Sequence, residues 1–385
     1  MSSLAKRNYL SELTALDWDF SGSRGNDGLA GYHWYPARFV PQVPGLLIGY
    51  FTEPGELVLD PFCGSGTTLT EAVRLGRRGI GIDTNPAAVM MSRGKLTPIS
   101  STEEWAGYVR AIRLAVEATT VARPEEDLLE SVPNEELRDW YDPRTLAELS
   151  AIWQSIPDGH PYDRVARVAF SSVLRSACSQ DNHWGWVCDN VKPKTMRYKP
   201  AREMFFAKLD DFGRKGLGVW EGFRTYAPIP DAGSAVRILE GAASECLRLL
   251  PDASVDAVVT SPPYYGTTDY ARSQRLSFMW FGWDLDESRY AEAGARFKRH
   301  RKNAYEEYLS DMRASFAEVR RVLRDQRHCA VVVGESTSRR AYLEDFHGVL
   351  EGVGFEIELI LERRLPAQRA LARLTHEEII LLKAN

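Results

Sequence analysis

Short apolar runs that end in polar turns recur along the chain and predict the strands of a buried sheet. The run over residues 56–62 is followed by a helical pattern over 64–75. A second strand over 79–83 and a helix over 85–93, with Pro86 in its first turn, complete a βαβ unit. Because a crossover connection joins parallel neighbours, this unit predicts a parallel sheet at the core.

The alternation of strands and helices stops in the middle of the chain. Residues 102–154 are helical and acidic, 163–179 have apolar residues at helical spacing, and 180–200 are rich in Trp, Asn and Pro. The alternation then resumes, with strands expected over 236–239, 255–260, 329–334, 355–361 and 377–383, and helices over 243–250, 305–323 and 342–350.

The simplest arrangement is one α/β domain with a large, mainly helical insertion between its second and third strands. We therefore expect the N-terminal part of this domain in residues 1–99 and its C-terminal part in 233–385. The inserted domain would occupy residues 100–232.

Composition narrows the class of protein only slightly. A hydrophobic fraction of 44% and a charged fraction of 26% are ordinary globular values, and a net charge of −5 means that any basic surface must be local. No apolar run reaches the roughly 18 residues of a spanning helix, and the N-terminus lacks a signal-peptide layout, so no membrane role is expected. The five cysteines form no Cys-x-x-Cys pair, which is typical of a reduced, cytoplasmic chain without a metal cluster.

A glycine-rich turn joins the first predicted strand to its helix. Gly64 and Gly66 lack the β-carbons that would block close approach, and a helix N-terminus attracts an anionic group. The turn has neither the GxGxxG spacing of dinucleotide sites nor the Gly-Lys-Ser/Thr of a P-loop. Asp83, at the end of the second strand, is placed to accept hydrogen bonds from ribose hydroxyls. The alternative interpretation is a tight structural turn.

A second special turn, Ser261–Tyr264, follows the strand that contains Asp256. Pro262 and Pro263 carry no N–H and fix the chain so that backbone carbonyls can accept hydrogen bonds. An exocyclic amine of a nucleic-acid base is a poor nucleophile. The backbone carbonyls of this turn and the Ser261 hydroxyl could accept hydrogen bonds from both N–H groups of such an amine. Tyr264 offers a flat face for a base rotated out of a duplex. A Pro-Pro turn of purely structural origin is the alternative.

Taken together, these turns resemble the cofactor and catalytic loops of S-adenosylmethionine-dependent DNA amino-methyltransferases. Asp60–Thr68 resembles the first motif of that family, Gly81–Pro86 the second, and His33–Gln42 the segment that closes over the cofactor. The resemblance implies a Rossmann-like class I methyltransferase fold with an antiparallel last strand, and S-adenosyl-L-methionine as cofactor. The cofactor residues that it implies are Arg38, Asp60, Phe62, Cys63, Gly64, Gly66, Thr67 and Asp83.

The same resemblance bears on the target base. Ser at position 261 is commonest among cytosine-N4 enzymes, whereas Asp or Asn there is commoner among adenine-N6 enzymes. Cytosine N4 is therefore favoured, with adenine N6 as the alternative. The chain departs from the family at the end of the third strand. The family often has Gly-Asp-Ala there, with the Asp near the cofactor's adenine, whereas this chain has residues 240–243 without an Asp. Glu240 or a backbone group would have to take the place of that Asp.

Two basic segments are candidates for binding double-stranded DNA, because clustered Lys and Arg bind phosphates through counterion release. Their cations are Lys192, Lys194, Arg197 and Lys199 in the inserted block, and Arg296, Lys298, Arg299, Arg301 and Lys302 after the catalytic turn. His183 and Trp184 could add base or groove contacts, or simply pack within their loop. A restriction endonuclease of the same system is a further expected partner.

Two other functions have to be weighed. RNA guanine-N2 methyltransferases share a similar glycine loop and a Pro-Pro-Tyr turn, but usually have Asp before the prolines and a shorter gap between the two loops. A non-catalytic DNA-specificity subunit is the other alternative. The intact glycine loop, Asp83 and Ser261–Tyr264 favour an active enzyme over such a subunit.

Overall fold

The computed structural model describes residues 9–20, 28–37, 40–180, 192–226, 235–334, 342–365 and 376–384. Its strands are β1 (Leu57–Asp60), β2 (Arg78–Asp83), β3 (Val236–Glu240), β4 (Val255–Thr260), β5 (Leu323–Gly334), β6 (Phe355–Arg364) and β7 (His376–Ala384).

The principal helices of the sheet region are α1 (Tyr9–Thr14), α2 (Gln42–Phe51), α3 (Thr67–Arg74), α4 (Pro86–Lys95), α10 (Ala243–Cys246), α14 (Ala304–Val322) and α15 (Tyr342–Gly352). Helices α11 (Tyr270–Ser273), α12 (Arg275–Phe281), α13 (Leu285–Ala291) and the short helix η4 (Arg296–His300) follow β4. Between β2 and β3 lie α5 (Thr102–Ala122), α6 (Glu125–Glu130), α7 (Pro143–Ser155), α8 (Asp163–Ala177) and α9 (Ala201–Tyr226). Among the residues described, no helix combines the length and the apolar character needed to cross a bilayer.

The strands form one seven-stranded sheet in the order β3-β2-β1-β4-β5-β7-β6. The neighbours from β3 to β5 are parallel, whereas β7 runs antiparallel to both β5 and β6. This arrangement confirms the predicted Rossmann-like class I methyltransferase fold with its antiparallel last strand. It also places the carboxyl ends of β1 and β4 side by side, because these two strands are direct neighbours.

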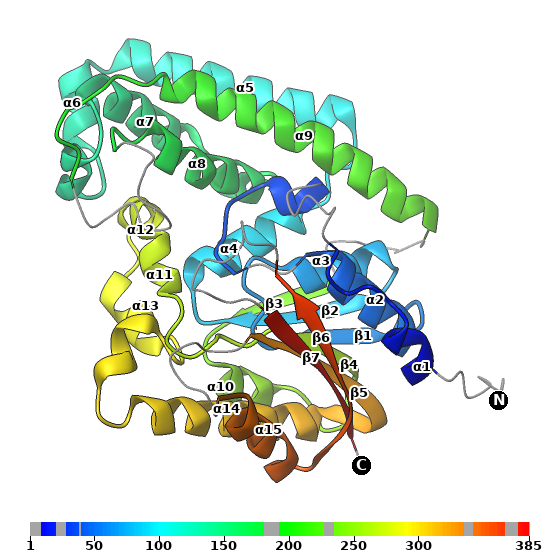
Figure 1. Cartoon of the computed structure of the whole chain (residues 1–385). Helices are drawn as coiled ribbons and strands as arrows, with labels where there is room; N and C mark the ends of the chain where they lie inside the picture. The colour runs from blue at the N-terminus through cyan, green and yellow to red at the C-terminus, as the bar shows by residue number, and fades with distance from the viewer. Residues whose placement is uncertain are drawn as a thin grey trace.

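Helices cover both faces of the sheet (Figure 1). On one face, α1 and α2 pack over β1, β4, β5 and β7 through buried residues such as Leu47 and Val259. On the other face, α14 and α15 pack through residues such as Phe316 and Phe346. The central strands are therefore apolar on both sides, as a buried parallel sheet requires.

Helices α5 to α9 gather on one side of the molecule, with α5 (cyan) and α9 (green) lying side by side in Figure 1. This helical block is joined to the sheet region through α4 and α8. A β-carbon on Gly94 of α4 would lie 2.4 Å from Val168 Cγ2 of α8, so the two helices approach too closely there for any larger residue. Helix α9, of 26 residues, was not predicted in any detail from the sequence.

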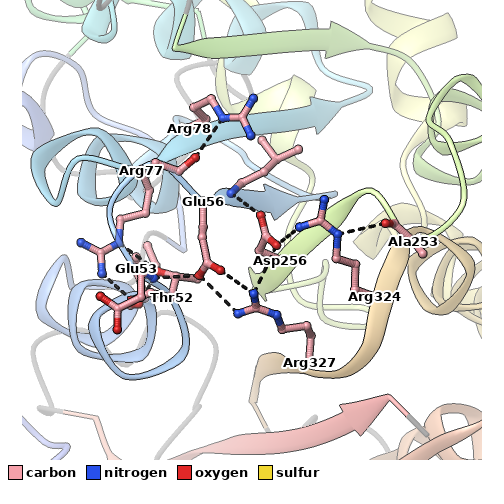
Figure 2. Close-up of polar contacts among 12 residues, drawn as sticks. Thr52, Glu53, Glu56, Arg77, Arg78, Ala253, Asp256, Arg324 and Arg327 are labelled. Carbon is pink, nitrogen blue, oxygen red and sulfur yellow. Dashed lines mark hydrogen bonds and ion pairs between the residues drawn. The ribbon is translucent and has the colours of Figure 1, made fainter. Parts of the chain in front are cut away.

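A cluster of arginines and carboxylates closes the amino edge of the sheet (Figure 2). The Asp256 carboxylate is buried; it accepts the Leu57 N–H at 2.9 Å and pairs with Arg324. Arg327 bridges Asp256 and Glu56. Asp256 therefore fastens β4 to β1 and β5 at the edge opposite the two special turns, and its role is structural.

We expect Asp256→Ala to lower the free energy of unfolding by about 2–4 kcal/mol, because the substitution removes a buried carboxylate that accepts the Leu57 N–H and pairs with Arg324 and Arg327. Asp325→Ala is the control: Asp325 pairs with Arg320, but its side chain is 77% exposed, so a loss below about 1 kcal/mol is expected. Urea denaturation measures both. Equal losses would show that the buried cluster has no special weight.

Candidate functional site

The two special turns meet at the carboxyl edge of the sheet. Asp60 ends β1 and Thr260 ends β4, and the Thr260 hydroxyl donates to Asp60 Oδ1 at 2.6 Å. Segments about 200 residues apart in sequence are thus joined directly by a buried hydrogen bond. The glycine turn and the Ser261–Tyr264 turn consequently open into the same space.

This space is a cavity of about 200 Å³. Of the residues predicted to bind a cofactor or act in catalysis, its lining contains Asp60, Phe62, Cys63, Gly64, Thr67, Asp83, Ser261, Pro263 and Tyr264. Gly66 and Pro262 belong to the two turns but do not line the cavity. Arg38 lies outside the described residues, although its neighbours Tyr35, Pro36 and Ala37 are part of the lining.

The glycine turn has the backbone that its sequence predicts. Gly64 has φ +50° and Gly66 φ +80°, a region that other residues rarely adopt. A β-carbon on Gly66 would also lie 2.8 Å from Ser92 Oγ of α4. The turn is therefore shaped by local glycine chemistry and by its packing against α4, and it leads into α3 at Thr67.

Asp83 supports the glycine turn from the end of β2. Its Oδ2 accepts the N–H of Gly64 and its Oδ1 accepts the N–H of Asn85, each at 2.8 Å. Burial raises the pKa of the Asp83 carboxyl to about 6. The carboxylate thus holds the turn in place, and each oxygen keeps a further lone pair that a ribose hydroxyl could use.

Cys63 is a buried thiol within the same turn. Burial raises its pKa well above the ordinary value, with the Asp83 and Asp60 carboxylates adding to the effect. A thiol in this setting is a poor nucleophile, because the reactive form is the thiolate. Cys63 instead packs against the backbone of β2, where a β-carbon on Gly81 would lie 3.0 Å from its sulfur.

Sequence reasoning missed several residues that line the cavity, among them Tyr35, Tyr270 and Glu292. The rings of Tyr35 and Tyr270 stack with their centroids 5.9 Å apart. The Glu292 carboxylate accepts the N–H groups of Tyr270, at 3.1 Å, and of Ala271. Burial raises the pKa of Glu292 to about 8. Tyr35 lies in the predicted closing segment, but Glu292 had no local signal, because only the fold brings it to the cavity.

The Ser261–Tyr264 turn is anchored from behind. Tyr264 is 7% exposed, and its hydroxyl lies 3.1 Å from Ser261 Oγ and donates to Glu377 at 3.1 Å. The carbonyl of Pro263 accepts the Tyr308 hydroxyl at 3.0 Å. One face of the turn is therefore fixed to the core, while Ser261, Pro263 and Tyr264 still line the cavity.

At the end of β3 the cavity is lined by 241–244 and not by Glu240, which is exposed. The family's Asp at this strand end could be replaced by Glu240 or by a backbone group. The structure brings the backbone of 241–244, and not Glu240, to the cavity.

A model of the DNA methylase family matches residues 6–93 and 255–380. These ranges contain the glycine turn, Asp83 and the Ser261–Tyr264 turn, and they make up more than half of the chain. The chain belongs to the DNA methylase family. This match confirms the predicted resemblance to DNA amino-methyltransferases that depend on S-adenosylmethionine.

Two relatives of the methylase align over long stretches. The chain is 26% identical to the type II methyltransferase M.MvaI of Kocuria varians, and the alignment covers 66% of this chain and 58% of that enzyme. It is 21% identical to the type II methyltransferase M.MjaII of Methanocaldococcus jannaschii, over 86% and 77% of the two chains. The chain thus spans less than two thirds of M.MvaI.

The basic residues predicted to bind DNA have diverse surroundings in the methylase. Lys192 pairs with Asp139 at 2.8 Å, Lys199 donates to the carbonyl of Ser176 at 2.9 Å, and Arg301 pairs with Glu307 at 3.1 Å. The remaining cations with exposed side chains are Lys194, Arg197, Arg296, Arg299 and Lys302. His183 and Trp184 lie outside the described residues.

Lys298 differs from the other cations of its run, because it is turned inward. It donates to the carbonyls of Tyr290, at 2.6 Å, and Glu292, at 2.8 Å, and burial lowers its pKa. The stretch 291–293 lines the cavity, so the run that follows it starts at the rim of the site.

Glu292 should make the stability of the ligand-free methylase depend on pH. Its folded-state pKa of about 8 exceeds the ordinary value of 4.5, so the folded state holds an extra proton between these values and loses stability as pH rises toward 8. Asp83, Asp269, Tyr270 and Lys298 surround it. Relative to the wild type, Glu292→Gln should gain about 2–3 kcal/mol between pH 6 and pH 9.

The measurement is urea unfolding at both pH values. A glutamine has one acceptor oxygen, so it can keep only one of the two hydrogen bonds from the N–H groups of Tyr270 and Ala271, and the variant can be less stable than the wild type at pH 6. The quantity that tests the prediction is the change, between the two pH values, in the stability difference between variant and wild type. Glu287→Gln, an exposed neighbour, serves as the control and should show no change with pH relative to the wild type. A Glu292→Gln difference that is the same at both pH values would mean that Glu292 is ionised throughout.

Proposed function

We propose that this protein transfers a methyl group from S-adenosylmethionine to the exocyclic N4 amine of a cytosine flipped out of duplex DNA. The observation that carries the proposal is the single cavity shared by the glycine turn and the Ser261–Tyr264 turn, which the Asp60–Thr260 hydrogen bond joins. One cavity then serves both methyl donor and acceptor, as direct transfer requires.

The cavity suits S-adenosylmethionine in charge and in hydrogen-bonding groups. The cofactor is a sulfonium cation, and the buried carboxyls of Asp60 and Asp83 line the cavity. Ser65 Oγ and Asn85 Nδ2 are buried and have no hydrogen-bond partner within the described part of the chain. Such orphaned polar atoms are costly unless a ligand pairs with them. We assign Asp83 to the ribose hydroxyls and Tyr35 to the wall of the site.

When bound, the cofactor supplies an electrophilic methyl group, and the chain has to orient the amine that attacks it. Ser261 Oγ, which lines the cavity, is the proposed acceptor for one N–H bond of the amine, and a backbone carbonyl of the same turn is the proposed acceptor for the other. Tyr264 is the proposed surface for the base. No covalent bond between enzyme and base is needed. This agrees with the buried thiol of Cys63, whose raised pKa makes it unsuitable as the cysteine nucleophile of C5 methylation.

A serine at position 261 supports cytosine N4 as the target over adenine N6, the alternative. The relatives named type II methyltransferases support a cytoplasmic role beside a restriction endonuclease of the same system. To test the substrate class, methyl-labelled S-adenosylmethionine is offered with unmethylated genomic DNA or with RNA. Label in DNA alone is expected; label in RNA alone would favour the guanine-N2 alternative.

We further propose that the inserted block, residues 100–232, sets sequence preference, while the basic run after the catalytic turn adds affinity for any duplex. The block lies outside the residues matched by the family model, as a variable recognition element would. The run begins at the rim of the cavity, where phosphates flanking a flipped base would lie.

Replacing Arg299, Arg301 and Lys302 by alanine should weaken binding to every duplex and reduce the slope of log affinity against log salt by about 2–3. The matched control replaces Arg78, Arg248 and Arg320, which removes the same charge away from the cavity. Binding is measured by fluorescence anisotropy across a salt series. A loss confined to one target sequence, or an equal loss in the control, would contradict this division of roles.

A further inference from the structure

A buried chain of polar groups runs behind the catalytic turn. Arg363 Nη1 in β6 donates to Glu377 Oε2 in β7 at 2.7 Å. The other oxygen of Glu377 accepts the Tyr264 hydroxyl at 3.1 Å, and the Tyr264 and Ser261 oxygens are 3.1 Å apart. The antiparallel strands at the red end of Figure 1 are therefore connected, through side chains, to Ser261 in the lining of the cavity.

The depth of this ion pair requires an explanation. The Arg363 side chain is 1% exposed and that of Glu377 11%. Removing two charges from water costs several kcal/mol, and apolar residues of similar volume often stabilise a fold as well or better. Arg363 is also tied to the N-terminal segment, because its Nε donates to the carbonyl of Trp18 at 3.1 Å. Stability alone does not account for a charged pair at this position.

The chain of groups fixes the direction of two protons. A carboxylate paired with arginine can only accept, so the single proton of the Tyr264 hydroxyl is directed to Glu377. The other acceptor near that hydroxyl is the carbonyl of Val332, which is farther away at 3.4 Å. The Tyr264 oxygen is then an acceptor for Ser261, whose own proton turns away from the cavity. The lone pairs of Ser261 Oγ remain for the substrate.

We propose that Glu377 and Arg363 are positioning residues that, through Tyr264, hold the Ser261 hydroxyl as a hydrogen-bond acceptor for the amine. This inference rests on the proposed amine methylation. Without Glu377, Tyr264 can donate to Ser261, and the serine proton is free to point at the amine nitrogen. That orientation opposes the attack, because the nitrogen lone pair would be engaged by a donor.

The test keeps the buried site neutral to avoid an unpaired charge. The Arg363→Met, Glu377→Leu double variant removes the acceptor, and the Arg363→Met, Glu377→Gln double variant retains a carbonyl that can accept from Tyr264. With saturating DNA and cofactor, the first should lower the single-turnover rate by roughly 10–100-fold, while KM for DNA changes less than about 3-fold. The second should recover most of the rate. A merely structural pair would not separate leucine from glutamine in this way.

Tyr264→Phe supplies a second comparison, because it keeps the ring and removes the hydroxyl. In this background, the leucine double variant should cause no further loss of rate, since the two changes break the same connection. Glu378→Gln is the control: Glu378 follows Glu377 in β7 and pairs with His347 at 2.8 Å. It should leave the rate unchanged.

Equal rates for the leucine and glutamine variants, or a loss that adds to that of Tyr264→Phe, would overturn the inference. A wild-type protein that methylates no DNA amine would overturn the proposed function instead. The connection itself is then tested by unfolding: the effects of Tyr264→Phe and Arg363→Met, Glu377→Leu on stability should be non-additive. Additive effects would show that Tyr264 and Glu377 are not coupled.

Discussion

Replacing Ser261 by alanine should lower the single-turnover rate of methyl transfer by about 100-fold or more, while the affinity for S-adenosylmethionine changes little. The substitution removes the side-chain acceptor that holds the amine in the orientation for attack. It leaves the glycine turn and Asp83 intact. Rapid-quench assays with labelled cofactor measure the rate, and calorimetry measures cofactor binding.

Cys63→Ser is the matched control for this experiment, because it also changes one small polar side chain in the lining of the cavity. Direct transfer requires no thiol, so we expect this variant to retain substantial activity. A Cys63→Ser enzyme that bound cofactor but transferred no methyl group would contradict direct transfer. Full activity in Ser261→Ala would remove Ser261 from the chemistry.

Asp83→Ala should weaken S-adenosylmethionine binding by about 100-fold, which is near 3 kcal/mol. Two losses combine: the N–H groups of Gly64 and Asn85 lose their acceptor, so the glycine turn is no longer held, and the ribose loses its proposed partner. Calorimetry with the purified protein measures the affinity, and thermal unfolding shows whether the fold survives.

Glu240→Ala is the control, because Glu240 lies directly opposite Asp83 in the pairing of β2 and β3 but does not line the cavity. Its affinity for the cofactor should stay within about 2-fold of the wild type. If both variants bound the cofactor equally well, neither strand end would hold the ribose, and the assignment of Asp83 would be wrong.

The features that sequence reasoning found are those whose chemistry is local. Glycines at 64 and 66, the two prolines of the Ser261–Tyr264 turn, and Asp83 after a short strand each determine a nearby backbone conformation. Their meeting in one cavity could be predicted because the carboxyl ends of neighbouring parallel strands share an edge. The alternation of strands and helices predicted a parallel sheet, whereas the order of its strands was not predicted.

The features that sequence reasoning missed depend on long-range pairing. Glu292 reaches the cavity only through the turn of chain after β4, and Glu377 meets Tyr264 only because β7 inserts next to β5. Asp256 belongs to the strand that leads into the Ser261–Tyr264 turn, yet its carboxylate lies at the opposite edge of the sheet. A position within a strand does not by itself tell which end of the sheet a polar side chain serves.

The most direct test of amine methylation is mass spectrometry of nucleosides from duplex DNA that has been incubated with the protein and S-adenosylmethionine. N4-methylcytosine is the predicted product, and it should be absent when the cofactor is omitted. N6-methyladenine would retain the amine mechanism but move the target to the alternative base. Finding 5-methylcytosine, or no methylated base on DNA that contains all sequence contexts, would contradict methyl transfer to an exocyclic amine.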